Sequence, residues 1–439
     1  MSYTPLGLHS GDVLTARALA HMESGIIDAA TPAQVALGMI SAESIGCRAN
    51  DPDFDNAVPL NEYFSTAGRS IAFAQGDYHF RTPLVLSSPR RISCPHGSRL
   101  VLDADVEGPA VSIRYRYADK VPADTGISLR VDLDGHARDG IMMDGAYGGD
   151  FNLMARDFTG VGITITHSLG LSGRLQASNT KTLADTGLLL DSTDDRWDKL
   201  GAVNCRVGVR LTGADSWADV VHCWCDGVRG DQTVTGVSVE GDYYTIGMLV
   251  SDGLVRAIRL TDQPMCTILA YVEYATPDSD QSCVAYLDPP VGSGSTHPGL
   301  SIMDSRIGTA PAHLLDSSDW TRAATHRIDL GRLHMPHASP LTLSGIASKP
   351  GMLPALETAF GRANWDSLVP CAQSDCPGGV LRVTPMGGPG GDPGAVGLLA
   401  EITTPDRSWR AVLPAGGPLT ADTTWRQTIA ATIPNPNNQ

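Results

Sequence analysis

The stretch that decides the fold is a repeat in which a glycine is followed by alternating apolar residues. It occurs at Gly140-Ile-Met-Met143, Gly162-Ile-Thr-Ile165, Gly187-Leu-Leu-Leu190, Gly208-Val-Arg-Leu211, Gly227-Val-Arg229 and Gly247-Met-Leu-Val250. Short strands that recur about every 20 residues, with no helical segment between them, are typical of a β-solenoid. An ordinary β-sandwich is the alternative, but it gives no reason for a sustained repeat.

Stacking explains why such a repeat is stable. A single coil cannot bury its apolar face, whereas coils stacked about 4.8 Å apart enclose a continuous core lined by ladders of similar residues. Cys205 and Cys225 are separated by about one repeat. We therefore expect them to stack inside the solenoid as structural thiols.

The composition supports β structure and excludes several functions. Hydrophobic residues make up 42% and charged residues 18% of the 439 residues, which argues against wholesale disorder. With 47 glycines, 29 prolines and only 6% aromatics, the chain is rich in turns. A net charge of −16 disfavours binding to nucleic acid or to anionic lipid. No apolar run is long enough to span a membrane, so we expect no membrane insertion.

The two ends differ from the repeat. Residues 1–45 are predicted to form two short helices, at about 16–24 and 32–44, and they carry no secretory signal. The nine cysteines form no disulfide framework, which indicates free thiols and a reducing compartment. The apolar runs 396–402 and 408–413 alternate as strands do, so a small antiparallel β domain is expected at the C-terminus.

Two segments resemble bacteriophage tail proteins. Gly11-Asp-Val-Leu-Thr-Ala-Arg-Ala-Leu-Ala-His-Met-Glu-Ser-Gly-Ile26 is similar to the N-terminal segment of tail, baseplate and receptor-binding proteins of phages that infect Gram-positive bacteria, although Ala20 stands where that family often has Asn. Ala67–Tyr78 and Asp215–Trp224 resemble coils of the pectate-lyase-like β-helix of phage tailspikes. The resemblance implies a mainly β fold: a right-handed parallel β-helix over 46–345, a helical virion anchor over 1–45 and a C-terminal β domain over 346–439.

The same resemblance implies a biological setting. The protein would be a homotrimer in the virion tail, made and assembled in the host cytoplasm. Residues 1–45 would contact other tail or baseplate proteins, and the C-terminal domain would serve as the tip, for trimerisation or glycan binding. The implied function is binding to host cell-surface polysaccharide during adsorption. The alternatives are a polysaccharide depolymerase, acting as a glycoside hydrolase or a lyase, and a purely structural tail component.

One repeated motif suggests a site. Asp195-Arg-Trp197 and Asp215-Ser-Trp217 share the pattern Asp-x-Trp and are separated by about one coil. Stacking would set Asp195 beside Asp215 and Trp197 beside Trp217. Two carboxylates about 5 Å apart suit a retaining glycosidase, because their like charges would raise the pKa of one of them and so supply the general acid. Sugar rings pack on exposed indoles, so the two tryptophans would form a platform. The alternative is that the aspartates close turns while the indoles are packed inside.

Further candidates lie about one coil beyond this motif. Glu240 and Asp242 are weaker catalytic candidates, and Tyr243 and Tyr244 are candidates for substrate binding. His222-Cys-Trp-Cys225 has some metal-ligand residue types, but its alternating thiols are expected to point into the core. No nucleotide-binding or common hydrolase motif is present, so we expect neither a metal nor another cofactor.

Overall fold

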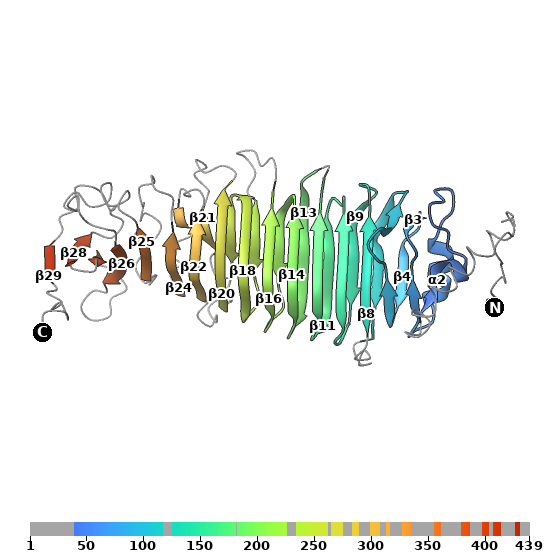
Figure 1. Cartoon of the computed structure of the whole chain (residues 1–439), viewed down its shortest axis with the longest axis horizontal. Coiled ribbons are helices and arrows are strands. Elements are labelled where there is room, and N and C mark those ends of the chain that lie inside the picture. Colours follow the sequence, from blue (N-terminus) through green and yellow to red (C-terminus); the bar gives the residue numbers. More distant parts are fainter. Residues whose placement is uncertain are drawn as a thin grey trace, which may run out of the picture.

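The computed structural model describes residues 39–116, 125–180, 182–225, 234–261, 265–274, 283–288, 299–307, 313–316, 327–334, 355–360, 379–386, 397–403, 407–413 and 426–430. Over these residues the chain is mostly β-strand and winds into a parallel β-helix, as predicted. The strands stack along the long axis of the molecule, with α2 at the N-terminal end and β29 at the C-terminal end (Figure 1).

Two parallel sheets form the wall of the solenoid, and from β7 to β24 the chain alternates between them. Sheet B holds β4 (Leu84–Ser87), β7 (Val106–Arg114), β9 (Ala137–Asp144), β11 (Val161–Leu169), β13 (Ala184–Thr193), β15 (Cys205–Leu211), β17 (Thr235–Val239), β19 (Arg256–Leu260), β21 (Cys283–Leu287) and β23 (His313–Asp316). The parallel part of sheet A holds β1 (Ile40–Ser41), β2 (Ser70–Ala72), β3 (Gly76–Phe80), β5 (Arg91–Ser93), β6 (Ser98–Leu102), β8 (Gly126–Asp132), β10 (Asp150–Arg156), β12 (Ser172–Ser178), β14 (Arg196–Val203), β16 (Trp217–Trp224), β18 (Tyr244–Leu254), β20 (Met265–Tyr274), β22 (Gly299–Ile307) and β24 (Arg327–His334).

Ladders of aliphatic side chains fill the space between the sheets. One ladder in sheet B runs through Ile141, Ile163, Leu188, Val209, Val237 and Ile258. The corresponding ladder in sheet A runs through Leu129, Leu153, Leu175, Leu200, Val221 and Leu249. All twelve side chains are buried, because alternate residues of each strand point inward and neighbouring coils cover them from both sides.

The repeated glycines are needed where the two sheets approach most closely. A Cβ on Gly187 would lie 2.6 Å from the carbonyl oxygen of Gly208 and 2.8 Å from the Cβ of Ala202 in sheet A. A Cβ on Gly208 would lie 2.6 Å from the sulfur of Cys223. Gly187 and Gly208 therefore mark the narrowest part of the core, where no side chain fits. Gly247 of the predicted repeat lies instead on β18 of sheet A, where a Cβ would lie 2.8 Å from the carbonyl oxygen of Asp219, and Gly227 lies outside the described residues.

The cysteines are buried, but they are not stacked as predicted. Cys205 begins β15 in sheet B, whereas Cys223 lies on β16 in sheet A. The backbone hydrogen bonds place Cys225 in register with Asn204, so the expected match between Cys205 and Cys225 is wrong. Burial raises the pKa of the Cys223 thiol to about 12, which fits an unreactive structural residue.

The N-terminal end of the solenoid begins differently from the prediction. Residues 1–38, which include the first predicted helix, lie outside the described residues. Ile40–Ser41 form β1 rather than the end of the second helix, and only η1 (Ala42–Ile45), a 3-10 helix, follows them. Ile40 pairs with Ile71 of β2, so strand pairing has replaced helix formation there.

A helix that was not predicted from the sequence, α2 (Ala57–Phe64), lies against the first strand of sheet B. Its Leu60 and Phe64 are buried in the core. The amide nitrogen of Asn61 donates to the carbonyl oxygen of Pro83 at 2.9 Å, and its amide oxygen accepts from the backbone N–H of Val85 at 2.7 Å. The Asn61 side chain thus bonds to both backbone groups as a neighbouring strand would.

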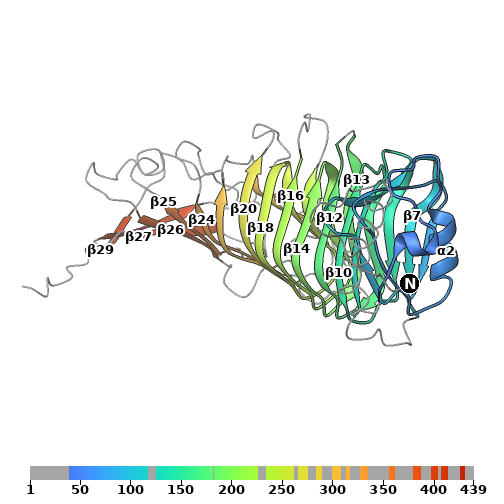
Figure 2. The same ribbon diagram turned by 45° about the vertical axis from the view of Figure 1, so that its right-hand side comes forward.

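Five strands follow the last parallel strand of sheet A. They are β25 (Ala355–Phe360), β26 (Gly379–Met386), β27 (Gly397–Thr403), β28 (Arg407–Leu413) and β29 (Arg426–Ala430). β25 pairs parallel with β24, and the later strands pair antiparallel in sequence order, so they continue sheet A at its C-terminal end (Figure 2). The two predicted strands at 396–402 and 408–413 are confirmed as β27 and β28, whereas the domain boundary at residue 346 stays a prediction.

Candidate functional site

The candidate residues lie where the chain turns from sheet B into sheet A. Isolated bridges align Thr193, Ala214 and Asp242 of successive coils, so the residues that follow each of them also correspond. These are Asp194, Asp215 and Tyr243, with left-handed φ values of 57°, 51° and 58°. This conformation is uncommon for residues other than glycine, although aspartate adopts it more readily than most. In each of these coils a single left-handed residue turns the chain out of sheet B, and the next strand of sheet A begins one or two residues later.

The strand register does not bring equivalent residues of the two Asp-x-Trp motifs opposite each other. Arg196 of β14 pairs with Trp217 of β16, and Trp197 pairs with Ala218. Trp197 therefore points inward and is 2% exposed, whereas Trp217 points outward and is 45% exposed. The predicted stacking of Trp197 on Trp217 is wrong, because the offset between the two coils is one residue longer than the spacing of the motifs.

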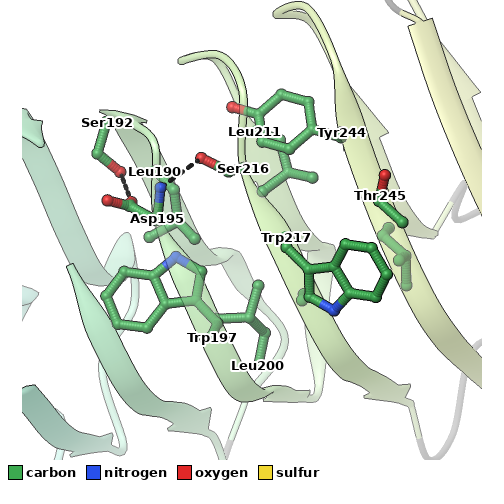
Figure 3. A pocket seen from close by; sticks show the side chains of 12 residues that line it. Leu190, Ser192, Asp195, Trp197, Leu200, Leu211, Ser216, Trp217, Tyr244 and Thr245 are labelled. Atoms are coloured by element: carbon green, nitrogen blue, oxygen red, sulfur yellow. Dashed lines mark hydrogen bonds between the residues drawn. The ribbon is translucent and has the colours of Figure 1, made fainter. Parts of the chain in front are cut away.

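Asp195 is part of the interior and does not lie beside Asp215 as predicted. It is 3% exposed and lies opposite Ser216 (Figure 3). One carboxylate oxygen accepts from the Leu171 backbone N–H at 2.9 Å, and the other accepts from the Ser192 hydroxyl. Burial raises the pKa of Asp195 to about 6, although these hydrogen bonds oppose the shift. Asp195 therefore stabilises the corner through these hydrogen bonds and is not accessible to a substrate.

Tyr244 also points inward, unlike its neighbour Tyr243. Tyr244 is 5% exposed and lines an internal cavity together with Asp195 and Trp197 (Figure 3). The cavity measures about 10 Å³, which is far too small for a sugar. Of the four aromatic residues predicted to bind substrate, Trp217 and Tyr243 are accessible, whereas Trp197 and Tyr244 are part of the core.

The outer surface of β16 and β18 carries exposed aromatic and apolar side chains, which we call the aromatic face. It consists of Trp217, Trp224, Tyr243 and Met248. Trp217 and Trp224 begin and end β16, so they lie roughly 20 Å apart at the usual rise of a strand. The indole nitrogen of Trp217 donates to the Asp219 carboxylate at 2.6 Å, which fixes the orientation of the exposed ring.

Two carboxylates adjoin the aromatic face at the corner. The backbone N–H of Asp215 donates to the carbonyl oxygen of Asp242 at 3.0 Å, and Asp215 is exposed. The pKa of Asp242 is raised, first by partial burial and then by the negative charge of Asp215. The two neighbouring carboxylates are therefore Asp215 and Asp242, and they lie close to Trp217 and Tyr243.

Glu240 lies on the sheet B side of the corner, directly after β17. Its two carboxylate oxygens accept from the Arg210 guanidinium at 2.7 and 2.8 Å, and the Ser238 hydroxyl donates to it at 3.0 Å. Arg210 lies on the outer surface of sheet B. The structure therefore does not bring Glu240 onto the aromatic face, and its carboxylate is already occupied by a bidentate ion pair.

Three residues of this region were not identified as candidates from the sequence. They are Asp219, Trp224 and Met248. An odd separation such as that between Trp217 and Trp224 normally places two residues on opposite faces of a strand. The burial pattern of β16 departs from strict alternation at Asp219–Val220, and both indoles consequently point outward. His222 lies between them on the same face, and burial and Lys199 lower its pKa.

The described part of the chain shows neither a metal-binding cluster nor a membrane-spanning helix. Within these residues no three His, Cys, Asp or Glu side chains gather as metal ligands would. None of the helices in the same residues is long and apolar enough to cross a bilayer. Fold and surface together define a parallel β-helix with an exposed aromatic face beside a carboxylate pair.

Comparison with solved structures finds a viral protein that shares this fold. A protein described as ORF18 of Geobacillus virus E2 superposes with a TM-score of 0.51 at 10% identity, over 95% of this chain and 80% of that one. The gp42 tailspike of Acinetobacter phage vb_AbaP_AS12 gives a TM-score of 0.44 at 11% identity, over 91% and 84% of the two chains. No protein-family model and no curated protein matches the sequence. The predicted likeness to β-helical phage proteins is thus confirmed at the level of the fold.

Proposed function

We propose that the protein is a phage tail component that binds host cell-surface carbohydrate through the aromatic face. The observation that carries the proposal is Trp217, an exposed indole held in one orientation by Asp219. Sugar rings present apolar C–H faces that pack on such rings, and a ring already held in place loses little conformational entropy on binding. Asp215 and Asp242 at the corner and His222 on the outer surface of β16 are the polar side chains that would supply hydrogen bonds to sugar hydroxyls.

The viral setting rests on two further considerations. The protein of Geobacillus virus E2 shares the fold, and Gly11–Ile26 resembles the N-terminal segments of phage tail proteins. We extend the proposal to a homotrimer whose residues 1–45 attach to other tail or baseplate proteins and whose residues 346–439 form the tip. A truncated chain that lacks residues 1–38 keeps β1 and η1, so it should still bind carbohydrate but should no longer join phage particles.

Binding to purified host cell-wall polysaccharide tests the central claim. Trp217→Ala and Tyr243→Ala should each weaken retention strongly, because each removes an exposed ring. Val85→Ala is the control, because Val85 is an exposed apolar residue on β4 of sheet B. If Trp217→Ala binds as tightly as the wild type does, the aromatic face is not the carbohydrate site.

A second candidate function is hydrolysis of the same polysaccharide. It is favoured by the carboxylate pair, because the raised pKa of Asp242 suits a general acid, and Asp215 is the neighbouring carboxylate that could act as nucleophile or base. The wild type would then release new reducing ends, and Asp215→Asn or Asp242→Asn would abolish the release. Asp194→Asn is the control, because Asp194 occupies the same corner position one coil earlier. A lyase would instead give unsaturated sugar ends, and binding without release would exclude an enzyme.

A further inference from the structure

A separate groove is formed on the outer surface of sheet A by residues of β6, β8 and β10. β8 lies towards the N-terminal end of the stack (Figure 1). The groove has a volume of about 290 Å³. Three arginines from successive strands line it: Arg99 of β6, Arg130 of β8 and Arg156 of β10. Asp77 and Asp132 are its two carboxylates, and Met154 supplies an apolar surface.

Ion pairs hold Arg99 firmly in this groove. Its guanidinium donates to both oxygens of Asp77 at 2.7 and 2.8 Å and to Asp132 at 2.9 Å. The hydrogen bonds from Arg99 lower the pKa of Asp77, so that carboxylate stays ionised. Arg99 therefore uses both carboxylates of the groove, and neither is left to neutralise another arginine.

The other two arginines of the groove differ in their ion pairs. Within the described residues, Arg130 forms no ion pair with any carboxylate. Arg156 contacts Oδ2 of the buried Asp157 at 3.3 Å, while the backbone N–H and the hydroxyl of Thr180 donate to Oδ1 of the same carboxylate. The charge of Arg130 is therefore not offset by an ion pair among the described residues, which on a chain of net charge −16 is a local exception that suits an anionic ligand.

The strand register connects the groove to the aromatic face. Arg156 pairs with Ser178, Ser178 pairs with Val203, and Val203 pairs with Trp224. Three strand spacings, about 14 Å, therefore separate Arg156 from Trp224 along one row of the same surface. In the adjacent row, Arg130 connects in the same way to His222 through Met154, Gln176 and Gly201. A polymer lying along the solenoid axis would meet both sites.

We propose that this groove binds the acidic group of an anionic polysaccharide whose sugar rings rest on the aromatic face. The inference deepens the proposed function and rests on it. A guanidinium presents paired N–H groups that match the two oxygens of a carboxylate or a phosphodiester, and Met154 offers a surface for the adjoining sugar ring. Arg130 is the principal ligand, because its charge is not already neutralised.

The test compares three defined polymers on the full chain. Polygalacturonate carries carboxylates, poly(glycerol phosphate) carries phosphodiesters, and dextran is neutral. The wild type should bind one acidic polymer more tightly than dextran, and added salt should weaken that preference. Arg130→Gln should lower the affinity for the preferred polymer about tenfold, as expected for the loss of a charged hydrogen bond. The affinity of Arg130→Lys should lie between those of the wild type and Arg130→Gln, because lysine keeps the positive charge but lacks the paired N–H groups of a guanidinium.

Arg206→Gln is the matched control, because it removes one exposed arginine from β15 of sheet B. It should bind like the wild type, and circular dichroism should show all variants folded. Equal losses in Arg130→Gln and Arg206→Gln, or no loss in Arg130→Gln, would overturn the inference. If Trp217→Ala weakens binding to host polysaccharide while Arg130→Gln does not, this inference fails and the proposed function stands. If the wild type binds no polysaccharide, both fail.

Discussion

The indole nitrogen of Trp217 donates a 2.6 Å hydrogen bond to the carboxylate of Asp219, two residues further along β16. Both residues lie on the outer surface of sheet A, and Trp217 is 45% exposed. An exposed tryptophan with a fixed ring offers a flat apolar platform whose orientation does not depend on a bound ligand. The preorganised ring is the basis of the first prediction.

Releasing the Trp217 ring should weaken carbohydrate binding without unfolding the protein. Asp219→Ala removes the acceptor, so part of the binding energy must then be used to order the indole. We expect an affinity loss of roughly three- to tenfold, as for a modest hydrogen bond. Asp185→Ala on β13 of sheet B is the control, because Asp185 is similarly exposed. An unchanged affinity in Asp219→Ala, measured by calorimetry, would show that the hydrogen bond does not position the ring.

Trp197 and Trp217 should respond differently to the same truncation. Trp197→Ala empties a buried position and should lower the free energy of unfolding by about 3–5 kcal/mol. Trp217→Ala removes a half-exposed ring and should cost far less stability while losing carbohydrate binding. Chemical denaturation of both variants checks this difference. Equal destabilisation would contradict the register in which Trp197 pairs with Ala218.

The stability of the corner at Asp195 should depend on pH. Its pKa is about 6 in the folded chain, above the ordinary value near 3.9 in an unfolded chain, so the folded state favours the protonated form. The contribution of Asp195 to stability is therefore complete below about pH 4 and is lost as the pH rises towards and through about 6. Up to about 3 kcal/mol should separate the two limits.

Asp195→Asn isolates this effect from the other titrating groups. The variant stays neutral, so its stability relative to the wild type should increase between about pH 4 and 7. Unfolding midpoints measured for both proteins across this range provide the comparison. A constant difference between the two proteins would mean that the carboxyl titrates normally.

Adding a methyl group at the narrowest part of the core should be costly. Gly187→Ala would place its Cβ 2.6 Å from the Gly208 carbonyl oxygen, and such overpacking typically costs about 1–3 kcal/mol. Gly126→Ala is the control, because a Cβ there meets nothing within 4 Å. Thermal unfolding should show a lower midpoint for Gly187→Ala alone. Similar midpoints in the two variants would indicate that the sheets can separate slightly to make room.

The solenoid could be predicted because its determinants repeat. Glycines such as Gly187 and Gly208 recur where side chains do not fit, and apolar residues recur beside them. The repeat can therefore be recognised in the sequence even though the coils differ in length. The helix α2 was missed because it occurs once, and no repeat distinguishes it. Pro59, which lies in its first turn, is a signal that could have indicated it.

The site could be predicted only in part, because its residues depend on register. The spacing of the two Asp-x-Trp motifs is one residue shorter than the offset between their coils, and such a shift reverses which face a side chain occupies. The departure from alternation within β16 likewise reverses the face that Trp224 occupies, so that its indole points outward. The groove could not be predicted from the sequence either. Its arginines, Arg99, Arg130 and Arg156, are separated by unequal numbers of residues and become neighbours only through strand pairing.

The contact between Asn61 and β4 has a consequence for assembly. The first strand of an open sheet has unpaired backbone groups that can recruit a strand from another molecule. Asn61 occupies the Pro83 carbonyl and the Val85 N–H, and α2 covers the strand beside them. Sheet B is thereby closed to head-to-tail extension at this end. A strand from another copy would therefore have to displace α2 and break both Asn61 hydrogen bonds before it could pair with β4.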